Sequence, residues 1–464
     1  MTLIEHVDMG LPASFVWDYD SRRPRLSKLY EKSKVMQWNA STDVDWSVEI
    51  DPGAVPEMAQ FADAQLDDLG PIARRLGDTP EMMHEIIAQN HGWLISQFMH
   101  GEQGALLATA KICAAAESID DKYYAAAQVA DEARHVEAYQ RYLDKIGYRY
   151  PVSPSLDELL NQVMSHRHVD MTYLGMQILV EGVALAAFSL GGAMLANPLI
   201  GQVTDLVRRD EARHVAFGVL SLQGTYDDMD PVDRQEREDF VLEACALMRD
   251  RFAPKQVWEH FGIPVDEAEV EFAASPDAIA FRSLLFSKVV PNLRKLGLLT
   301  PRVREGFEQL GILRYERYID SATEAGELEP DQLTAEEASD PLLAMRAQLG
   351  TVDRIAPEPV LMVIASMADR SALREVPLAR IRLVVDGGEH GDGGDFLLTV
   401  GGGELGYENA PADVDERADV RIGMDVETWT DIVAGRLSPP AAAIEGRITI
   451  GGDLTKALAL EALL

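Results

Sequence analysis

Two copies of one short motif decide the fold of this chain: Val129-Ala-Asp-Glu-Ala-Arg-His-Val136 and Arg208-Arg-Asp-Glu-Ala-Arg-His-Val215. The copies share the run Asp-Glu-Ala-Arg-His-Val, so each contains Glu-x-x-His. On a helix, residues three positions apart lie on one face, and the carboxylate and imidazole of each copy can therefore bind one ion together. The repeat predicts two equivalent halves of one metal site.

Each copy is preceded by a further acid inside an apolar helical run. Glu102 precedes Glu132 by 30 residues, and Glu181 precedes Glu211 by 30 residues. That separation spans one helix, a tight turn and part of an antiparallel partner, so the two acids of each pair should face each other at one depth. Two such hairpins predict a four-helix bundle with a two-metal centre, whose ligands would be Glu102, Glu132, His135, Glu181, Glu211 and His214.

The ligand types indicate which metals the centre takes. Carboxylates bridge two ions and imidazole suits iron, so two iron ions are expected, and a manganese–iron pair fits the same ligands. Four carboxylates would neutralise two divalent ions. Without metal, Glu102 and Glu181 would be poorly compensated buried charges among apolar neighbours. Dioxygen is the expected co-substrate.

The motif also supplies partners for the histidines. Asp131 and Asp210 are predicted to accept the free N–H of a metal-bound imidazole, which would fix its tautomer. Arg134 and Arg213 are predicted to pair with these aspartates. The alternative is that both pairs are ordinary ion pairs on a helix surface.

Two further residues near the pattern need an interpretation. Tyr139 lies four residues after His135, where it would hold a radical, line the pocket or simply pack in the core. A third Glu-x-x-His, Glu81-Met-Met-His84, falls in a first helical turn, where the helix dipole explains the acid. We do not expect this third copy to bind metal.

Apolar periodicity divides the chain into parts. Residues 1–53 are expected to be an N-terminal arm packing on the bundle, 54–313 the helical di-iron domain, 314–340 an acidic linker and 341–464 a smaller α+β domain. The fold class is therefore multidomain, with an all-α four-helix-bundle core and extra helices before an α+β domain. Expected helices are 78–115, 119–146, 169–195, 199–226, 234–251, 277–290, 426–434 and 454–463, and expected strands are 379–386, 396–400, 405–407, 418–424 and 447–450.

Composition excludes several classes of function. The chain has 464 residues with 42 basic against 77 acidic side chains, a net charge of −35, which disfavours nucleic acid and anionic membranes as partners. Its two cysteines, Cys113 and Cys245, lie in apolar helical patterns, as in a reducing compartment. The N-terminus lacks signal-peptide features, and the apolar stretch Val183–Met194 is too short to span a bilayer. A cytoplasmic location is predicted.

The ligand series resembles that of the ferritin-like di-iron oxygenases and oxidases, over roughly residues 55–313. The doubled Asp-Glu-x-Arg-His is similar to the hydroxylase subunits of bacterial multicomponent monooxygenases. The placement of Tyr139 is similar to the small subunit of class I ribonucleotide reductase. Arylamine N-oxygenases of this superfamily carry an extra histidine four residues before the last Glu-x-x-His, where this sequence has Val207, which argues against amine N-oxygenation of that kind.

The C-terminal part resembles the sterol carrier protein 2-like fold over about residues 341–464. The segments that carry the resemblance are Ala418-Asp-Val-Arg-Ile, Gly435-Arg-Leu-Ser-Pro-Pro and Glu445-Gly-Arg-Ile-Thr-Ile, in a stretch that runs on to Leu463. The resemblance implies a five-stranded sheet with helices around an apolar tunnel. It implies a module for ligand binding, capping or dimerisation, without chemistry of its own.

Together these observations predict an O2-dependent di-iron monooxygenase or oxidase. Its substrate would be a small organic molecule, aromatic or apolar, and its reaction hydroxylation, desaturation or oxidative C–C cleavage. Since no flavin or iron–sulfur motif is present, electrons would come from a reductase, a ferredoxin or a small reductant. A homodimer is expected. The alternatives are an iron-storing or peroxide-detoxifying ferritin-like protein and a lipid carrier whose metal is structural.

Overall fold

The computed structural model describes two separate units, and each is considered by itself. The described residues are 4–53, 79–194, 197–274, 276–316, 318–328, 349, 352, 354–367, 372–374, 376–388, 391–437, 439–444, 446–452 and 454–457. One unit comprises Met1–Pro56 with Asp68–Leu328, and the other comprises Glu57–Asp67 with Glu329–Leu464.

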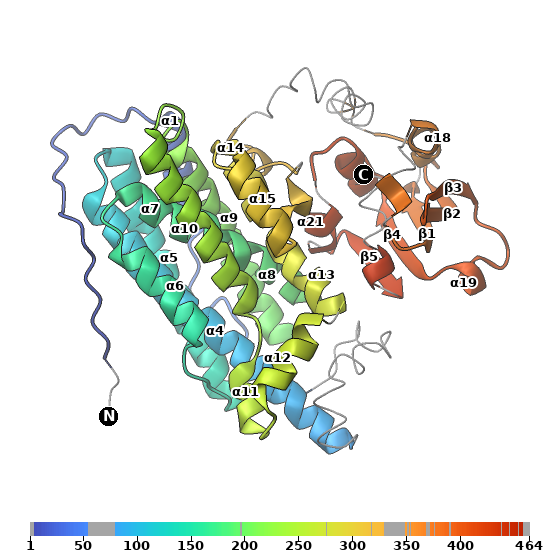
Figure 1. Ribbon diagram of the computed structural model, residues 1–464, viewed down its shortest axis with the longest axis horizontal. Helices are drawn as coiled ribbons and strands as arrows, with labels where there is room; N and C mark the ends of the chain where they lie inside the picture. The colour runs from blue at the N-terminus through green and yellow to red at the C-terminus, as the bar shows by residue number, and fades with distance from the viewer. Residues whose placement is uncertain are drawn as a thin grey trace. The chain divides into compact units, whose positions relative to one another are not determined.

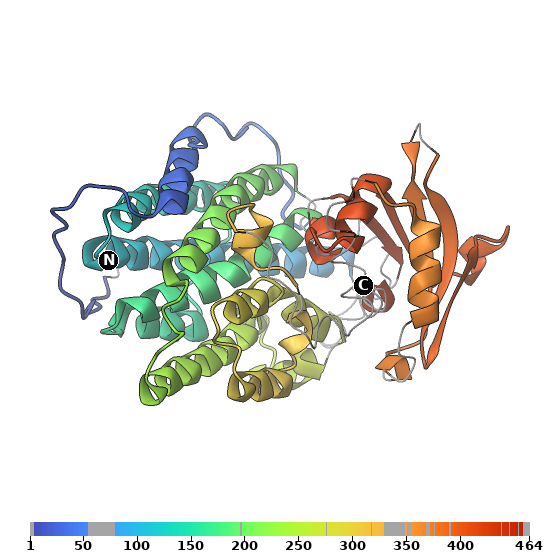
Figure 2. The ribbon, with the colours of Figure 1, turned by 90° about the horizontal axis from the view of Figure 1, so that it is seen from above.

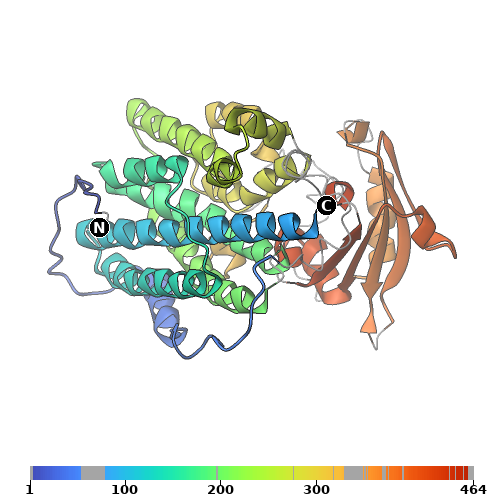
Figure 3. The same cartoon turned by 90° about the horizontal axis from the view of Figure 1, so that it is seen from below.

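A bundle of long helices forms the centre of the first unit (Figure 1). It consists of α4 (Pro80–Ala115), α5 (Ile119–Ile146), the combined helix α7 (Val169–Tyr173), η2 (Leu174–Val180) and α8 (Glu181–Met194), and α9 (Pro198–Leu222). Figure 3 shows α4, in blue, running the length of this unit. The predicted fold class is confirmed.

The sequence explains where α5 begins and ends. The Ser118 hydroxyl accepts a hydrogen bond from the Asp121 N–H at the start, and Gly147 ends the helix in the left-handed conformation with φ 79°. Between α4 and α5 only three residues, 116–118, make the turn. A turn this short forces the two helices to run antiparallel, which brings Glu102 beside Glu132 at one depth.

The third bundle helix differs from its prediction. Residues 169–195 were expected to form one regular helix, but 174–180 form a π-helix that ends next to Glu181. A π turn inserts an extra residue and shifts the helix face, and apolar periodicity alone does not reveal such a shift. The segment Val169–Phe188 is also apolar enough to cross a membrane, but 94% of its most apolar window is buried inside the protein, as befits a central bundle helix.

Shorter helices surround the bundle: α6 (Pro154–Ser165), α10 (Pro231–Asp250), α11 (Lys255–His260), α12 (Val265–Ala274), α13 (Pro276–Leu285), α14 (Val289–Lys295), α15 (Pro301–Leu310), η3 (Leu313–Tyr315) and α16 (Ser321–Glu324). The single helix predicted over 277–290 is wrong, since α13 and α14 are separated by a turn. Ser321, within the predicted linker 314–340, bonds the helical unit: its N–H and Oγ lie 2.7 and 3.1 Å from the side-chain amide of buried Asn292. Much of the remaining predicted linker lies outside the described residues.

The N-terminal arm contains a helix that periodicity did not predict, α1 (Pro24–Val35). It is short and rich in charged residues, so its apolar pattern is weak. Leu26 and Leu29 are nevertheless buried, and α1 contacts α5 and α9. Figure 2 shows α1 as the dark blue helix lying on the bundle. Arg23 anchors its start through hydrogen bonds of 2.8 and 3.0 Å to Asp121 at the beginning of α5.

The second unit is a five-stranded sheet with helices. Its strands are β1 (Ala379–Asp386), β2 (Gly394–Gly401), β3 (Glu404–Asn409), β4 (Val420–Asp425) and β5 (Ile448–Gly452), in the order β3-β2-β1-β4-β5. Only the β1–β4 pair of this sheet is parallel. Described helical segments are α18 (Pro357–Met367), η5 (Ala372–Arg374), α19 (Val414–Arg417), α20 (Val426–Val433), α21 (Pro439–Ile444) and α22 (Leu454–Ala457).

Alternation along β1 explains the core of this unit. Ile381, Leu383 and Val385 are buried while Arg380 is exposed, the period of two that a strand with one apolar face requires. These side chains pack in one cluster with buried Trp429 of α20. Residues 458–463 of the last predicted helix lie outside the described residues.

A glycine on α9 lets that helix approach η2 closely. A Cβ added at Gly218 would lie 2.4 Å from Gln177 Cβ, whereas a Cβ at Gly201 on the same helix would meet nothing within 4 Å. We expect Gly218→Ala to lower the free energy of unfolding by about 1–3 kcal/mol through overpacking. Gly201→Ala should raise it by about 0.5–1 kcal/mol, as alanine usually does in a helix. Urea denaturation of both variants measures this, and a Gly218→Ala protein as stable as Gly201→Ala contradicts the close contact.

Candidate metal centre

The structure brings the six predicted ligand residues together in the bundle core. Their side-chain ligand atoms form two groups, each with all its atoms within 4.8 Å of one another. The first group contains Glu102, Glu132, His135 and Glu211, and the second contains Glu132, Glu181 and His214. Glu132 belongs to both groups, so the two groups adjoin. Every one of the six side chains is buried.

Both imidazoles turn the same ring nitrogen toward the carboxylates. His135 Nδ1 lies 3.1 Å from Glu102 Oε2 and 3.3 Å from both Glu132 Oε2 and Glu211 Oε1. His214 Nδ1 lies 3.1 Å from Glu132 Oε1 and 3.5 Å from Glu211 Oε1. Nδ1 is therefore the atom that each histidine offers to an ion.

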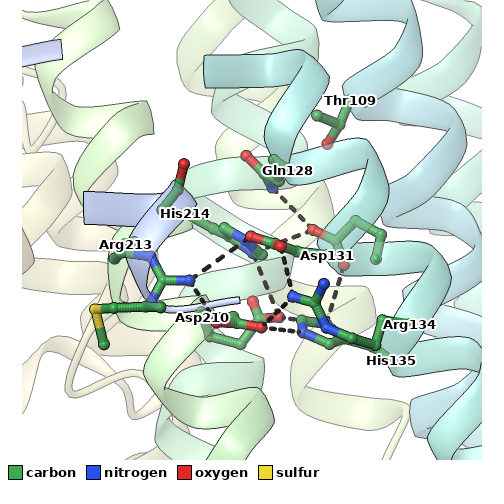
Figure 4. A network of polar contacts seen from close by, with 12 residues as sticks. Thr109, Gln128, Asp131, Arg134, His135, Asp210, Arg213 and His214 are labelled. Carbon is green, nitrogen blue, oxygen red and sulfur yellow. Dashed lines mark hydrogen bonds and ion pairs between the residues drawn. The ribbon is translucent and has the colours of Figure 1, made fainter. Parts of the chain in front are cut away.

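The other ring nitrogen of each histidine faces an aspartate of the opposite repeat. His135 Nε2 lies 3.0 Å from Asp210 Oδ2, and His214 Nε2 lies 3.3 Å from Asp131 Oδ2 (Figure 4). The pairs cross between the repeats because α5 and α9 pack side by side. With Nε2 donating to a carboxylate, Nδ1 is left with its lone pair for a metal.

Two arginines, Arg134 and Arg213, each contact both Asp131 and Asp210. Arg134 Nη2 lies 2.6 Å from Asp131 Oδ1 and 3.1 Å from Asp210 Oδ2. Arg213 pairs with Asp210 and lies 3.7 Å from Asp131 (Figure 4). Burial raises the pKa of Asp210, but the hydrogen bond and charge of His135, followed by the charge of Arg213, outweigh it and hold that pKa below its ordinary value. The Arg213–Asp210 pair is buried and the Arg134 contacts are partly buried, so neither is a solvated surface pair.

The N-terminal arm supplies partners that the sequence reasoning missed. The Trp38 indole N–H donates to Asp210 Oδ2 at 2.7 Å, and Gln37 Nε2 donates to Asp131 Oδ1 at 2.9 Å. The Arg134 guanidinium also stacks 4.9 Å from the Trp38 ring centroid. A tryptophan next to a glutamine carries no motif, so only the folded arm shows that this segment covers the aspartates.

Without metal, the cluster holds protons. Burial, and then the charge of Glu211, raises the pKa of both Glu102 and Glu181 well above the ordinary value. Burial alone would lower the pKa of His135 and His214, but the charges of Glu102 and Glu132, respectively, raise it. Buried carboxylates and imidazoles thus share protons in place of an ion.

Several buried ligand atoms fit a metal better than a proton. Among the described residues, Glu132 Oε2, both carboxylate oxygens of Glu211, and His214 Nδ1 are buried and make no well-directed hydrogen bond, although all but Glu211 Oε2 lie 3.1–3.3 Å from an ion-pair partner. Such orphaned atoms are costly unless an ion binds them. Carboxylate from four helices, with Glu-x-x-His on two of them, is the donor set of two-metal carboxylate centres.

The remaining candidates, Tyr139 and His84, are not members of the two groups. The buried Tyr139 ring lies 6.2 Å from that of Phe98 and 6.0 Å from that of Phe188, and burial raises its pKa. It forms part of an aromatic wall, and a radical role stays a prediction. His84 lies 2.6 Å from Asp51, and both side chains are about half exposed.

Because the metal-free cluster is protonated, we expect loading to release protons. Metal affinity should then fall as the pH is lowered, since ions compete with protons for imidazole and carboxylate. Anaerobic calorimetry with Fe(II) in two buffers of different ionisation enthalpy measures the release. Equal heats in both buffers, with an affinity independent of pH, contradict it.

The contact between His135 Nε2 and Asp210 Oδ2 predicts the effect of Asp210→Asn. Losing the carboxylate beside His135 Nε2 should weaken metal binding about 10–100-fold. Asp205→Asn is the matched control, because this carboxylate is on the same helix but is partly exposed and bonds only arginines among the described residues. Equal metal affinity of the two variants, measured by competition with a chelator, contradicts the assignment.

Comparison with known proteins agrees with this geometry. Residues 20–297, more than half of the chain, match the sequence model of the family P-aminobenzoate N-oxygenase AurF. Residues 365–464 match the SCP-2 sterol transfer family. Both predicted resemblances are confirmed. No curated protein matches the chain.

Solved structures similar to the chain include two variants of an R2-like ligand-binding oxidase with an anaerobically reconstituted Mn/Fe cofactor. One is 18% identical, covers 60% of this chain and 94% of its own, and has a TM-score of 0.35. The other is 17% identical, covers 62% and 94%, and has a TM-score of 0.38. The match over residues 20–297 carries the assignment: the chain belongs to the P-aminobenzoate N-oxygenase AurF family and has a C-terminal domain of the SCP-2 sterol transfer family.

Proposed function

We propose that this protein is an O2-dependent oxygenase in which two iron ions, bound by the six predicted residues, oxidise a small organic substrate. The observation that carries the proposal is the convergence of six buried ligand side chains in two adjoining groups. The bound metal pair would supply the activation of dioxygen. A manganese–iron pair fits the same donors.

The chain's own residues orient and shield this centre. The crossed aspartates hold both imidazoles in one tautomer, and Arg134 and Arg213 neutralise the aspartates. Trp38, only 8% exposed, closes the arm over them. Excluding water in this way protects reactive chemistry from solvent.

An aromatic wall supports an apolar or aromatic substrate. The rings of Phe98 and Phe188 lie 4.8 Å apart, and Tyr139 is within 6.2 Å of both. Phe98 is one turn before Glu102 on α4, and Tyr139 one turn after His135 on α5. The wall therefore borders the first ligand group, where an aromatic ring would find face and edge contacts.

A buried cation that interacts electrostatically with Glu102 supports a substrate with an anionic group. Arg251 is 5% exposed, and its Nη1 has no hydrogen-bond partner among the described residues. Burial lowers its pKa to about 10, and the nearby charge of Glu102 acts against that shift. Once metal neutralises Glu102, the guanidinium would lack a counter-charge, which is costly. A substrate carboxylate, such as p-aminobenzoate carries in the family's name, would provide one.

The reaction is proposed at carbon: hydroxylation, desaturation or oxidative C–C cleavage. Val207, fully buried, occupies the position where arylamine N-oxygenases have an additional histidine and offers no ligand. N-oxygenation of an aromatic amine is the second candidate, and the family match favours it.

Electrons would come from an external reductase, ferredoxin or small reductant. The protein is proposed to be a cytoplasmic homodimer, and its C-terminal domain a binding, capping or dimerisation module.

The test is dioxygen uptake by iron-loaded protein with a chemical reductant and a panel of aromatic carboxylates, with product analysis by mass spectrometry. We expect substrate-dependent uptake that is lost in Glu181→Ala. Absence of substrate-dependent uptake overturns the proposal. A mineral core would instead favour iron storage, and full function of Glu181→Ala would favour a lipid carrier with a structural metal.

Arg251 gives a separate prediction about substrate binding. Arg251→Met should raise KM for a carboxylate substrate about 10–100-fold, because a charge-assisted hydrogen bond contributes about 1.5–3 kcal/mol. The matching neutral amide should be unaffected. Arg249→Met is the control, since this arginine is partly exposed and pairs with Asp250. Equal KM changes for the carboxylate and its amide contradict the role.

A further inference from the structure

The two sides of the metal centre differ in the residues that precede its glutamates. One helical turn before Glu102, Glu132, Glu181 and Glu211 stand Phe98, Gln128, Gln177 and Val207, respectively. Two of these residues are apolar and two carry amides. Both amides are fully buried, which is costly without hydrogen bonds.

The two glutamines meet at one ligand, Glu181. Gln128 Nε2 lies 2.9 Å from Glu181 Oε1 and 2.9 Å from Glu132 Oε1. Gln177, oriented so that its amide nitrogen faces the carboxylate, donates to Glu181 Oε1 at 3.0 Å. In this orientation the Gln177 oxygen accepts from Gln128 Nε2 at 3.3 Å. The opposite orientation shortens that hydrogen bond to 3.0 Å but sets the amide oxygen against the carboxylate oxygens of Glu181. Figure 4 shows the Gln128 amide pointing toward the polar cluster.

Local structure holds the Gln177 amide in place. Gln177 lies in the π-helical segment η2, and Gly218 of α9 leaves the room that its Cβ occupies. The amide atom turned away from Glu181 lies 3.3 Å from the Thr109 hydroxyl, which can donate or accept. This side chain therefore has a partner at each end.

The two amide groups donate hydrogen bonds mainly to ligands of the second ligand group. Glu132 and Glu181 are two of the three ligands of the second group, with His214. At the corresponding positions before Glu102 and Glu211, Phe98 and Val207 offer no donor. The first group has four ligand residues, so it depends less on the orientation of any single one.

We propose that Gln128 and Gln177 form an amide clamp, a pair of positioning residues that fixes the Glu181 carboxylate and so sets the affinity of the second ligand group for its ion. Two N–H donors on one carboxylate restrict its rotation about the terminal torsion. The carboxylate oxygen is then already oriented when the ion binds, so binding does not have to restrict the rotation of the carboxylate. The clamp rests on the proposed metal centre.

The test uses Gln177→Met and Gln128→Met, since methionine keeps an unbranched side chain but donates no hydrogen bond. Metal-free protein is titrated anaerobically with Mn(II), and free Mn(II) is followed by electron paramagnetic resonance. We expect the parent to bind two ions per chain. In each variant one ion should bind as in the parent and the other about 10–100-fold more weakly.

Gln97→Met is the matched control. Gln97 is also buried, but its amide bonds the Pro151 carbonyl at 3.0 Å and the Ser153 N–H at 2.8 Å, away from the ligands. It should bind both ions as the parent does.

Each outcome is decisive. Equal weakening of both ions, parent-like binding in both clamp variants, or the same loss in Gln97→Met overturns the clamp. If Gln177→Met fails to fold, Gln128→Met alone decides. A folded parent that binds no ion refutes the metal centre and the proposed function, which distinguishes that failure from failure of the clamp.

Discussion

The helical unit depends on placing four carboxylates and two imidazoles in a core that excludes water. Each buried charge would be prohibitive alone, so the bundle must supply an opposite charge at short range. Protons do so in the metal-free protein, where Glu102 and Glu181 have raised pKa values. Two divalent ions would do so more completely, because every ligand oxygen and nitrogen could then face a cation.

The residues around the six ligand side chains supply the charges and hydrogen bonds that hold these side chains in place. The Arg134 and Arg213 guanidiniums balance the two aspartates, and the aspartates orient the two imidazoles. The N-terminal arm completes this layer through Trp38. A segment remote in sequence from the motifs therefore helps to determine which nitrogen each histidine offers to a metal.

The centre has pseudo-symmetric ligands but unlike surroundings. Aromatic rings and the unpartnered Nη1 of Arg251 accompany Glu102, while Gln128 and Gln177 bond Glu181. The two halves of the repeat therefore carry matching ligand residues but different neighbouring side chains. We interpret the aromatic side as suited to substrate and the amide side as suited to holding a ligand in place.

The sequence by itself predicted that the six proposed ligand residues come together, and it predicted the bundle and the start and end of α5, because these follow from spacing along single helices and from local caps. It also determined the alternation of β1 and the change to an α+β unit. It did not reveal the π turn of η2, the helix α1 or the break between α13 and α14, because packing against other elements decides these features. Only the tertiary structure decided that Asp131 and Asp210 serve histidines of the opposite repeats, and that Trp38, Arg251 and Gln177 lie near the centre. Those contacts join residues far apart in sequence, for which spacing along one helix carries no information.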